Sequence, residues 1–161
     1  MSRSITISAS GRFEGYASIF GKIDKGGDVV MPGAFAKSLK NRPARQVRML
    51  FQHDPKEPIG RWFDIFETDI GLKVRGQLTS KVPRSDALAA LIEHGSVDGL
   101  SIGFRTVRAS RANASKPRRL WEVDLWEISV VTFPMLESAR IHPADLAQQL
   151  RRTSQIFASK P

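Results

Sequence analysis

The stretch LWEVDLWEISVVTF (residues 120–133) is the longest strand pattern in the chain, and Pro134 ends it. Its residues alternate between two faces, as in a β-strand that buries one side. Glu127 falls on the more apolar face, with Trp121, Val123, Leu125, Ser129 and Val131. A carboxylate on a buried face is costly unless it is paired or hydrogen-bonded. The pattern therefore predicts a partner for Glu127, either a histidine or one of the many arginines.

Shorter strand patterns fill much of the remaining chain, between glycine and proline turns. They cover residues 5–8, 11–20, 47–52, 61–67, 72–78 and 97–107. Helical spacing occurs in residues 32–39, 86–94 and 143–152, and residues 108–116 read as a basic loop. Ser85 is the expected N-cap of the second helix, and Gly95 is its expected end. About six or seven strands without βαβ alternation predict a mainly β (α+β) fold, an antiparallel β-barrel wrapped by a few helices.

The length of 161 residues is most simply one domain spanning residues 1–161, whose tail after about residue 152 is expected to be flexible. With no cysteine, the chain can form neither a disulfide nor a thiolate metal site. The three histidines are scattered, so no zinc spacing arises, and neither Gly21-Lys22 nor Gly26-Gly27 forms a phosphate loop. We therefore expect no metal and no cofactor.

The hydropathy pattern predicts the compartment in which the protein is found. No window approaches the roughly 20 apolar residues that span a bilayer, and the first residues lack the apolar core of a signal peptide. This predicts a protein of the cytoplasm or of a particle interior, with no membrane partner.

The formal net charge of +9 is unevenly placed along the chain. Residues 37–48 carry five basic side chains and residues 105–119 carry six, and neither run contains an acid. Such runs favour nucleic acid or an acidic protein surface as partner. They are equally compatible with a solvated surface that has no partner.

Ser101 lies between Gly99 and Gly103 in an otherwise apolar strand pattern. Because glycine weakens a strand, two glycines around one serine indicate close approach by another backbone or by a ligand. The spacing differs from the Gly-x-Ser-x-Gly elbow of the α/β-hydrolases. A small polar residue tolerated in a strand is the alternative interpretation.

His53 ends the strand pattern of residues 47–52, whereas the other two histidines have simpler structural explanations. Together with Ser101 and Glu127 it supplies the parts of a nucleophilic hydrolase. In such an enzyme the imidazole takes the hydroxyl proton and the acid orients the imidazole. A serine–lysine dyad that uses Lys73 or Lys81 remains open at this point.

Several ordered blocks are shared with a known family. They are residues 15–20, 27–35, 38–39, 53–54, 58–60, 71–74, 99–104 and 125–134. In these blocks the chain closely resembles the HK97-like prohead (capsid maturation) proteases of tailed bacteriophages. Met135, where the family usually has alanine, is a minor departure.

The resemblance implies a fold like that of the herpesvirus maturation proteases and a serine endopeptidase activity. Carried over by position, His53 is the general base, Ser101 the nucleophile and Glu127 the acid that orients His53. Metal and cofactor play no part.

The implied substrate is the scaffolding region of the major capsid protein, together with the protease itself. The implied place is inside the assembling procapsid in the host cytoplasm, and a homo-oligomer is expected. Nucleic acid is a possible partner but is not required. The competing hypotheses are a non-enzymatic capsid-assembly or scaffolding protein on the same fold and a basic nucleic-acid-binding barrel.

Overall fold

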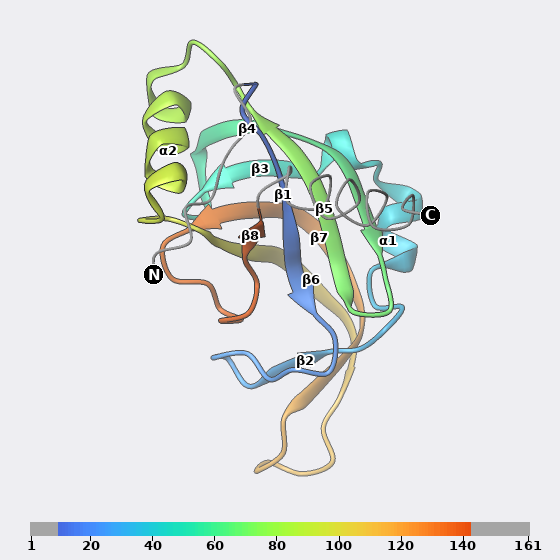
Figure 1. Ribbon diagram of the computed structural model, residues 1–161. Helices are drawn as coiled ribbons and strands as arrows, with labels where there is room; N and C mark the ends of the chain where they lie inside the picture. Colours follow the sequence, from blue (N-terminus) through green and yellow to red (C-terminus); the bar gives the residue numbers. More distant parts are fainter. Residues whose placement is uncertain (1–9, 143–161) are drawn as a thin grey trace, which may run out of the picture.

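Strand β7 (Arg118–Val131) organises the sheet in the computed structural model, which describes residues 10–142 (Figure 1). Strand β6 (Gly99–Ser110) pairs with it antiparallel along almost its whole length. Its other edge is shared by two parallel strands, β2 (Asp28–Val30) at the beginning and β3 (Arg48–Phe51) at the end. The longest strand pattern of the sequence is thus the strand with the most partners.

The sheet continues from β3 through β4 (Asp54–Glu67), β5 (Gly71–Leu78) and β1 (Arg12–Ile19), each antiparallel to the one before. The order is β2-β7-β3-β4-β5-β1-β8, with β6 on the free edge of β7.

The barrel closes through residues 139–142, which include β8 (Ile141–His142) and lie between β1 and β6. The N–H of Tyr16 donates to the carbonyl of Arg140 (3.2 Å), and the N–H of Leu100 donates to the carbonyl of Ala139 (2.9 Å). These bonds join the two open edges of the sheet, so the described strands form a curled, closed barrel.

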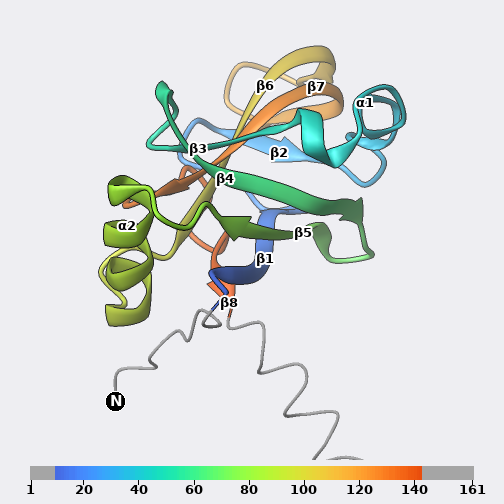
Figure 2. The same cartoon turned by 90° about the horizontal axis from the view of Figure 1, so that it is seen from above.

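The helices are few and lie outside the barrel. They are α1 (Ala36–Asn41), the 3₁₀ turn η1 (Ala44–Gln46) and α2 (Pro83–His94), with α1 and α2 on opposite sides (Figure 2). Helix α2 buries Leu88 and Ile92 and ends at Gly95, which adopts φ +81°. That left-handed conformation favours glycine at a helix end. No helix among residues 10–142 is long and apolar enough to cross a membrane.

Large apolar side chains from both halves of the chain fill the barrel. The rings of Phe13 (β1) and Trp62 (β4) meet edge to face with their centroids 5.5 Å apart. Other fully buried members of this core are Phe35, Met49, Ile59, Leu72, Leu100, Leu120, Leu125 and Ile128. Truncating a buried aromatic of this kind typically costs about 3–5 kcal/mol, so the core is the main source of stability.

The expected mainly β barrel with few helices is confirmed, with several local differences. The pairings of β2 and β3 with β7 are parallel, and β4 begins at Asp54 rather than at Arg61. The expected basic loop at residues 108–116 is found from residue 111 onward, and its first three residues belong to β6, which extends to Ser110. The N-cap prediction is wrong: Val82 occupies that position, and Ser85 lies inside α2 with its hydroxyl on the Ile59 carbonyl.

Three expectations concern other parts of the chain. The strand at residues 5–8, the helix at 143–152 and the flexible tail lie outside the described residues.

Candidate active site

Glu127 reaches the outer face of the sheet because β7 contains a bulge. Gly103 of β6 pairs with Glu127, and the next residue of β6 pairs with Leu125, so Trp126 has no partner on β6. An extra residue of this kind reverses the side-chain alternation. Leu125 and Ile128 therefore both point into the core, and Trp126 is 54% exposed. The expectation that Glu127 shares a buried face with Leu125 is wrong.

Gly103 provides the space that the carboxylate occupies. A Cβ built on Gly103 would lie 2.1 Å from Oε1 of Glu127, much closer than any nonbonded contact allows. At Gly99 a Cβ would lie 2.6 Å from the carbonyl oxygen of Val131. The close approach predicted from the two glycines is therefore confirmed, and at Gly103 the approaching group is the candidate acid.

His53 lies in a two-residue turn between β3 and β4. Gln52 and His53 have φ of 55° and 59°, the combination that a type I′ hairpin turn requires. Non-glycine residues adopt positive φ at a cost of about 1 kcal/mol or more each, so other contacts must stabilise the turn. The N–H of Gln52 donates to the Val130 carbonyl (3.0 Å), and its side-chain amide donates to the Thr132 hydroxyl (2.7 Å). These bonds hold His53 against β7.

The ring of His53 is hydrogen-bonded through Nδ1 to Oε1 of Glu127. The His53 side chain is 41% exposed, whereas that of Glu127 is only 14% exposed. This hydrogen bond and the negative charge of Glu127 raise the pKa of His53 above its ordinary 6.5, although partial burial opposes them. Because Nδ1 donates its hydrogen to the carboxylate, the neutral ring presents a lone pair on Nε2, as a general base must.

Ser129 joins both members of this pair and was not singled out from the sequence. Its hydroxyl donates to Oε2 of Glu127 (2.6 Å) and accepts from the backbone N–H of His53 (3.1 Å). Ser129 is fully buried, so each of these bonds is shielded from water. The only sequence signal was its place two residues after Glu127, which puts both side chains on one face of a regular strand.

Ser101 lies directly opposite Ser129 in the β6–β7 pairing, and opposed side chains share a face. Adjacent strands are about 5 Å apart, so Ser101 is a near neighbour of the His53–Glu127 pair. Its hydroxyl is buried and has no hydrogen-bond partner among residues 10–142. A cavity of about 20 Å³ borders it, with room for about one water molecule. The structure thus brings His53 and Glu127 into contact and places Ser101 beside them without a hydrogen bond.

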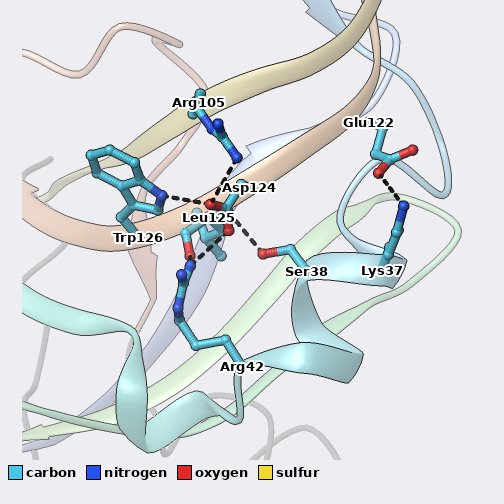
Figure 3. Close-up of polar contacts among 8 residues, drawn as sticks. All are labelled: Lys37, Ser38, Arg42, Arg105, Glu122, Asp124, Leu125 and Trp126. Carbon is cyan, nitrogen blue, oxygen red and sulfur yellow. Dashed lines mark hydrogen bonds and ion pairs between the residues drawn. The ribbon is translucent and has the colours of Figure 1, made fainter.

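Helix α1 supports β7 just before Glu127 (Figure 3). The Ser38 hydroxyl accepts from the N–H of Leu125 (2.8 Å), and the Arg42 guanidinium donates to the carbonyl of the same residue. Arg42 also contacts Asp124 (2.8 Å), which accepts from the Trp126 indole (2.8 Å). Ser38 of α1 and Arg42, which caps the end of the helix, therefore take the place of a neighbouring strand in the gap between β2 and β3.

The remaining titratable candidates lie elsewhere. Lys73 forms an ion pair with Glu14 (3.0 Å), and no contact joins Lys73 or Lys81 to Ser101. His94 is hydrogen-bonded to Ser96 (2.7 Å) at the end of α2. Within the described part of the chain, no three histidine or carboxylate side chains gather as metal ligands would.

Residues 2–155 match the family model described as caudovirus prohead serine protease. The prohead protease of Enterobacteria phage HK97 is 42% identical over 133 residues, which is 81% of this chain and 59% of that protein. The prohead protease of Escherichia phage T5 is 31% identical over 125 residues, 76% of this chain and 58% of that protein. The chain therefore spans a little under three fifths of the length of these two relatives.

Solved structures show the same fold at low sequence identity. The capsid assembly protease of bacteriophage T4 superposes with a TM-score of 0.62 at 16% identity, covering 74% of this chain and 80% of that one. The KSHV protease in complex with a hexapeptide phosphonate inhibitor gives a TM-score of 0.57 at 10% identity, covering 92% of this chain and 77% of that one. The likeness of the fold to the herpesvirus proteases is thus confirmed.

Proposed function

The chain belongs to the caudovirus prohead serine protease family, and from this premise we propose that it is a serine endopeptidase of phage head maturation. The observation that carries the proposal is the His53–Glu127 pair on the same sheet face as Ser101. An imidazole oriented by a carboxylate beside a serine hydroxyl is the arrangement from which acyl transfer proceeds.

In the proposed reaction, Oγ of Ser101 attacks the scissile carbonyl carbon while Nε2 of His53 takes the hydroxyl proton. Glu127 holds the ring through Nδ1–H and stabilises the imidazolium that forms. The imidazolium then returns the proton to the leaving amine as the C–N bond breaks. Water, activated by His53, hydrolyses the acyl ester and restores Ser101.

Ser101 has to move before this reaction can begin. Its buried hydroxyl lacks a hydrogen bond to His53 and borders a cavity too small for a peptide. Catalytic hydrogen bonds often form only in the substrate complex, so this geometry suits an enzyme at rest. Substrate binding would open the surface over Ser101 and bring its hydroxyl within reach of Nε2.

Ser129 acts here as a positioning residue. Its hydroxyl holds one carboxylate oxygen of Glu127, while the other oxygen holds Nδ1 of His53. Its bond to the backbone N–H of His53 also fixes the turn that carries the ring. We assign to Ser129 the alignment of acid and base, not a chemical step.

The substrate proposed is the scaffolding region of the major capsid protein, with self-cleavage as a second reaction. A homo-oligomer of this chain would carry out the cleavage inside the assembling procapsid, in the host cytoplasm. The names of the phage HK97 and phage T5 relatives, both prohead proteases, support this assignment.

The test is co-expression with the major capsid protein of the same phage, followed by the intact mass of that protein. Wild type and Ser80→Ala, which changes an exposed serine in the turn after β5, should both shorten it. Ser101→Ala and His53→Ala should leave it intact, since loss of either triad member costs about 10⁶ in turnover. Full-length capsid protein in shells assembled with wild type would favour a scaffolding role, and shortening by Ser101→Ala would exclude Ser101 as the nucleophile.

A further inference from the structure

A groove lies between the β6–β7 hairpin and the connection from β1 to β2. Its volume is about 610 Å³. It is lined by Gly21, Ile23, Val29, Met31, Ser110, Arg111, Ala112, Lys116, Pro117 and Arg119. Figure 1 shows the hairpin extending beyond the barrel, with β2 near its base. Ser101 and Ser110 are nine residues apart on β6, about 30 Å of extended strand, so the groove is separate from the catalytic site.

The rim of the groove is basic and its charge is unbalanced. Arg111, Lys116 and Arg119 are exposed and form no ion pair within residues 10–142. The neighbouring Arg118, in contrast, is neutralised by Asp28 through two bonds of 2.7 Å. No carboxylate lines the groove. Three uncompensated cations around one concavity favour an acidic occupant.

Apolar side chains also line the groove and make up what we call its floor. Ile23 is 59% exposed, and Val29, Met31 and Pro117 line the groove with it. An isoleucine left open to water in the same groove as the basic rim gives an occupant apolar surface to bury, in addition to charges to neutralise.

We propose that this groove binds an acidic peptide segment that also carries apolar side chains, on a partner protein. A phosphate backbone would satisfy the rim but would leave the apolar floor unused. A second copy of the chain would present the same basic residues at this face, so the groove does not complement itself. Residues 143–161 are themselves basic, with Arg151, Arg152 and Lys160 against Asp145, so they do not complement the groove.

The consequence for the protease is a second attachment point, remote from the bond that is cut. A partner held there is retained whether or not it presents a cleavage site. Binding at the groove is measurable without catalysis, so the inference stands or falls independently of the proposed function.

The probe is a fluorescent twelve-residue peptide of alternating glutamate and leucine, titrated with the full-length Ser101→Ala protein and followed by anisotropy. A twelve-residue polyglutamate, a lysine–leucine peptide and a single-stranded oligodeoxynucleotide are the comparison ligands. The glutamate–leucine peptide should bind most tightly, and added salt should weaken it.

Charge reversal at Arg111 and Lys116 (R111E/K116E) should weaken binding of the glutamate–leucine peptide by about tenfold or more. The matched control reverses two exposed basic residues of the other run, Lys40→Glu and Arg45→Glu, and should change it by less than about twofold. Ile23→Ser tests the floor and should weaken the glutamate–leucine peptide but not polyglutamate. Equal losses in the two double variants, or tighter binding of the oligonucleotide, would overturn the proposal, as would polyglutamate binding as tightly as the glutamate–leucine peptide.

Discussion

The carboxylate of Glu127 has three neighbours: Nδ1 of His53, the hydroxyl of Ser129 and the backbone of Gly103, which carries no side chain. The first two contacts are attractive and the third only leaves room. A change at Gly103 is therefore the most selective way to disturb the carboxylate while sparing the groups that bind it.

Gly103→Ala should displace Glu127, because the new Cβ would lie 2.1 Å from Oε1. Only a side chain has to move, but its bonds to His53 and to the buried Ser129 hydroxyl are lost, so the free energy of unfolding should fall by about 1–3 kcal/mol. Turnover should fall by about 10² or more, since a misplaced acid no longer orients His53. Kinetics and thermal unfolding of Gly103→Ala, with Gly26→Ala as the glycine control, separate the two effects. Unchanged turnover would contradict this account of the site.

The raised pKa of His53 predicts the pH dependence of activity. The base must be neutral, so kcat/KM should rise with pH through a midpoint above 6.5. Glu127→Gln removes the hydrogen-bonded charge and leaves the burial that lowers the pKa, so its midpoint should lie below that of wild type. Turnover should also fall, by about 10⁴.

The same pair links stability to pH. Because the folded pKa of His53 is raised, the pair adds to the free energy of unfolding below pH 6.5, and this contribution is lost as the pH rises through the folded pKa. Ring-proton NMR titration of His53 in the Ser101→Ala protein, with and without Glu127→Gln, measures the shift directly. Identical titration curves would show that Glu127 does not raise the pKa of His53.

Sequence patterns singled out Ser101, His53 and Glu127 as candidates but did not reveal the details that surround them. The orientation of Glu127 depends on the bulge at Trp126, which strict alternation cannot reveal, since a bulge reverses every face that follows it. Ser129 was not singled out, although it lies two residues after Glu127. Its importance comes from atoms of His53, 76 residues earlier in the chain, and not from any local pattern.

At the scale of elements, the unusual feature is a short helix that completes a strand edge. Ser38 and Arg42 satisfy both backbone groups of Leu125, two residues before Glu127 (Figure 3). Strands β2 and β8 escaped prediction because three and two residues are too few to show a period. Their pairings exist only because long-range partners are already in place.

Ser38→Ala should destabilise the protein by about 1–3 kcal/mol, because it leaves the buried N–H of Leu125 without an acceptor. Lys37→Ala is the matched control on the same helix. Lys37 forms an exposed ion pair with Glu122 (3.1 Å), and its loss should cost under about 1 kcal/mol. Chemical denaturation of both variants tests this difference. Equal midpoints would mean that α1 contributes nothing through Ser38.

At the scale of the whole molecule, the barrel is closed by residues 139–142 rather than by direct pairing of β1 with β6. Gly15 makes this closure possible, since a Cβ there would lie 2.3 Å from the carbonyl oxygen of Arg140. The backbone carbonyl of Arg140 cannot move aside as the end of a flexible side chain can. The strands were largely predictable from alternation, but this seam depends on two segments more than 100 residues apart.

Gly15→Ala should therefore destabilise the protein by about 3 kcal/mol and open the seam between β1 and residues 139–142. Hydrogen exchange should accelerate most at the Tyr16 amide, which bonds across this seam to Arg140, and less at the Leu100 amide, which bonds from β6 to Ala139. Gly26→Ala again serves as control. Protection at these amides equal to that of wild type would show that the barrel closes without Gly15.

The parallel pairing of β3 with β7 has a consequence for how the protein folds during its synthesis. His53 and Glu127 are 74 residues apart in the chain, so His53 leaves the ribosome well before Glu127 has been synthesised. Synthesis at about 5–20 residues per second separates the two by several seconds. Long-range strand pairing also folds slowly. A nascent chain therefore carries Ser101 and His53 before their proposed acid has been made, and the last long strand to be synthesised supplies that acid.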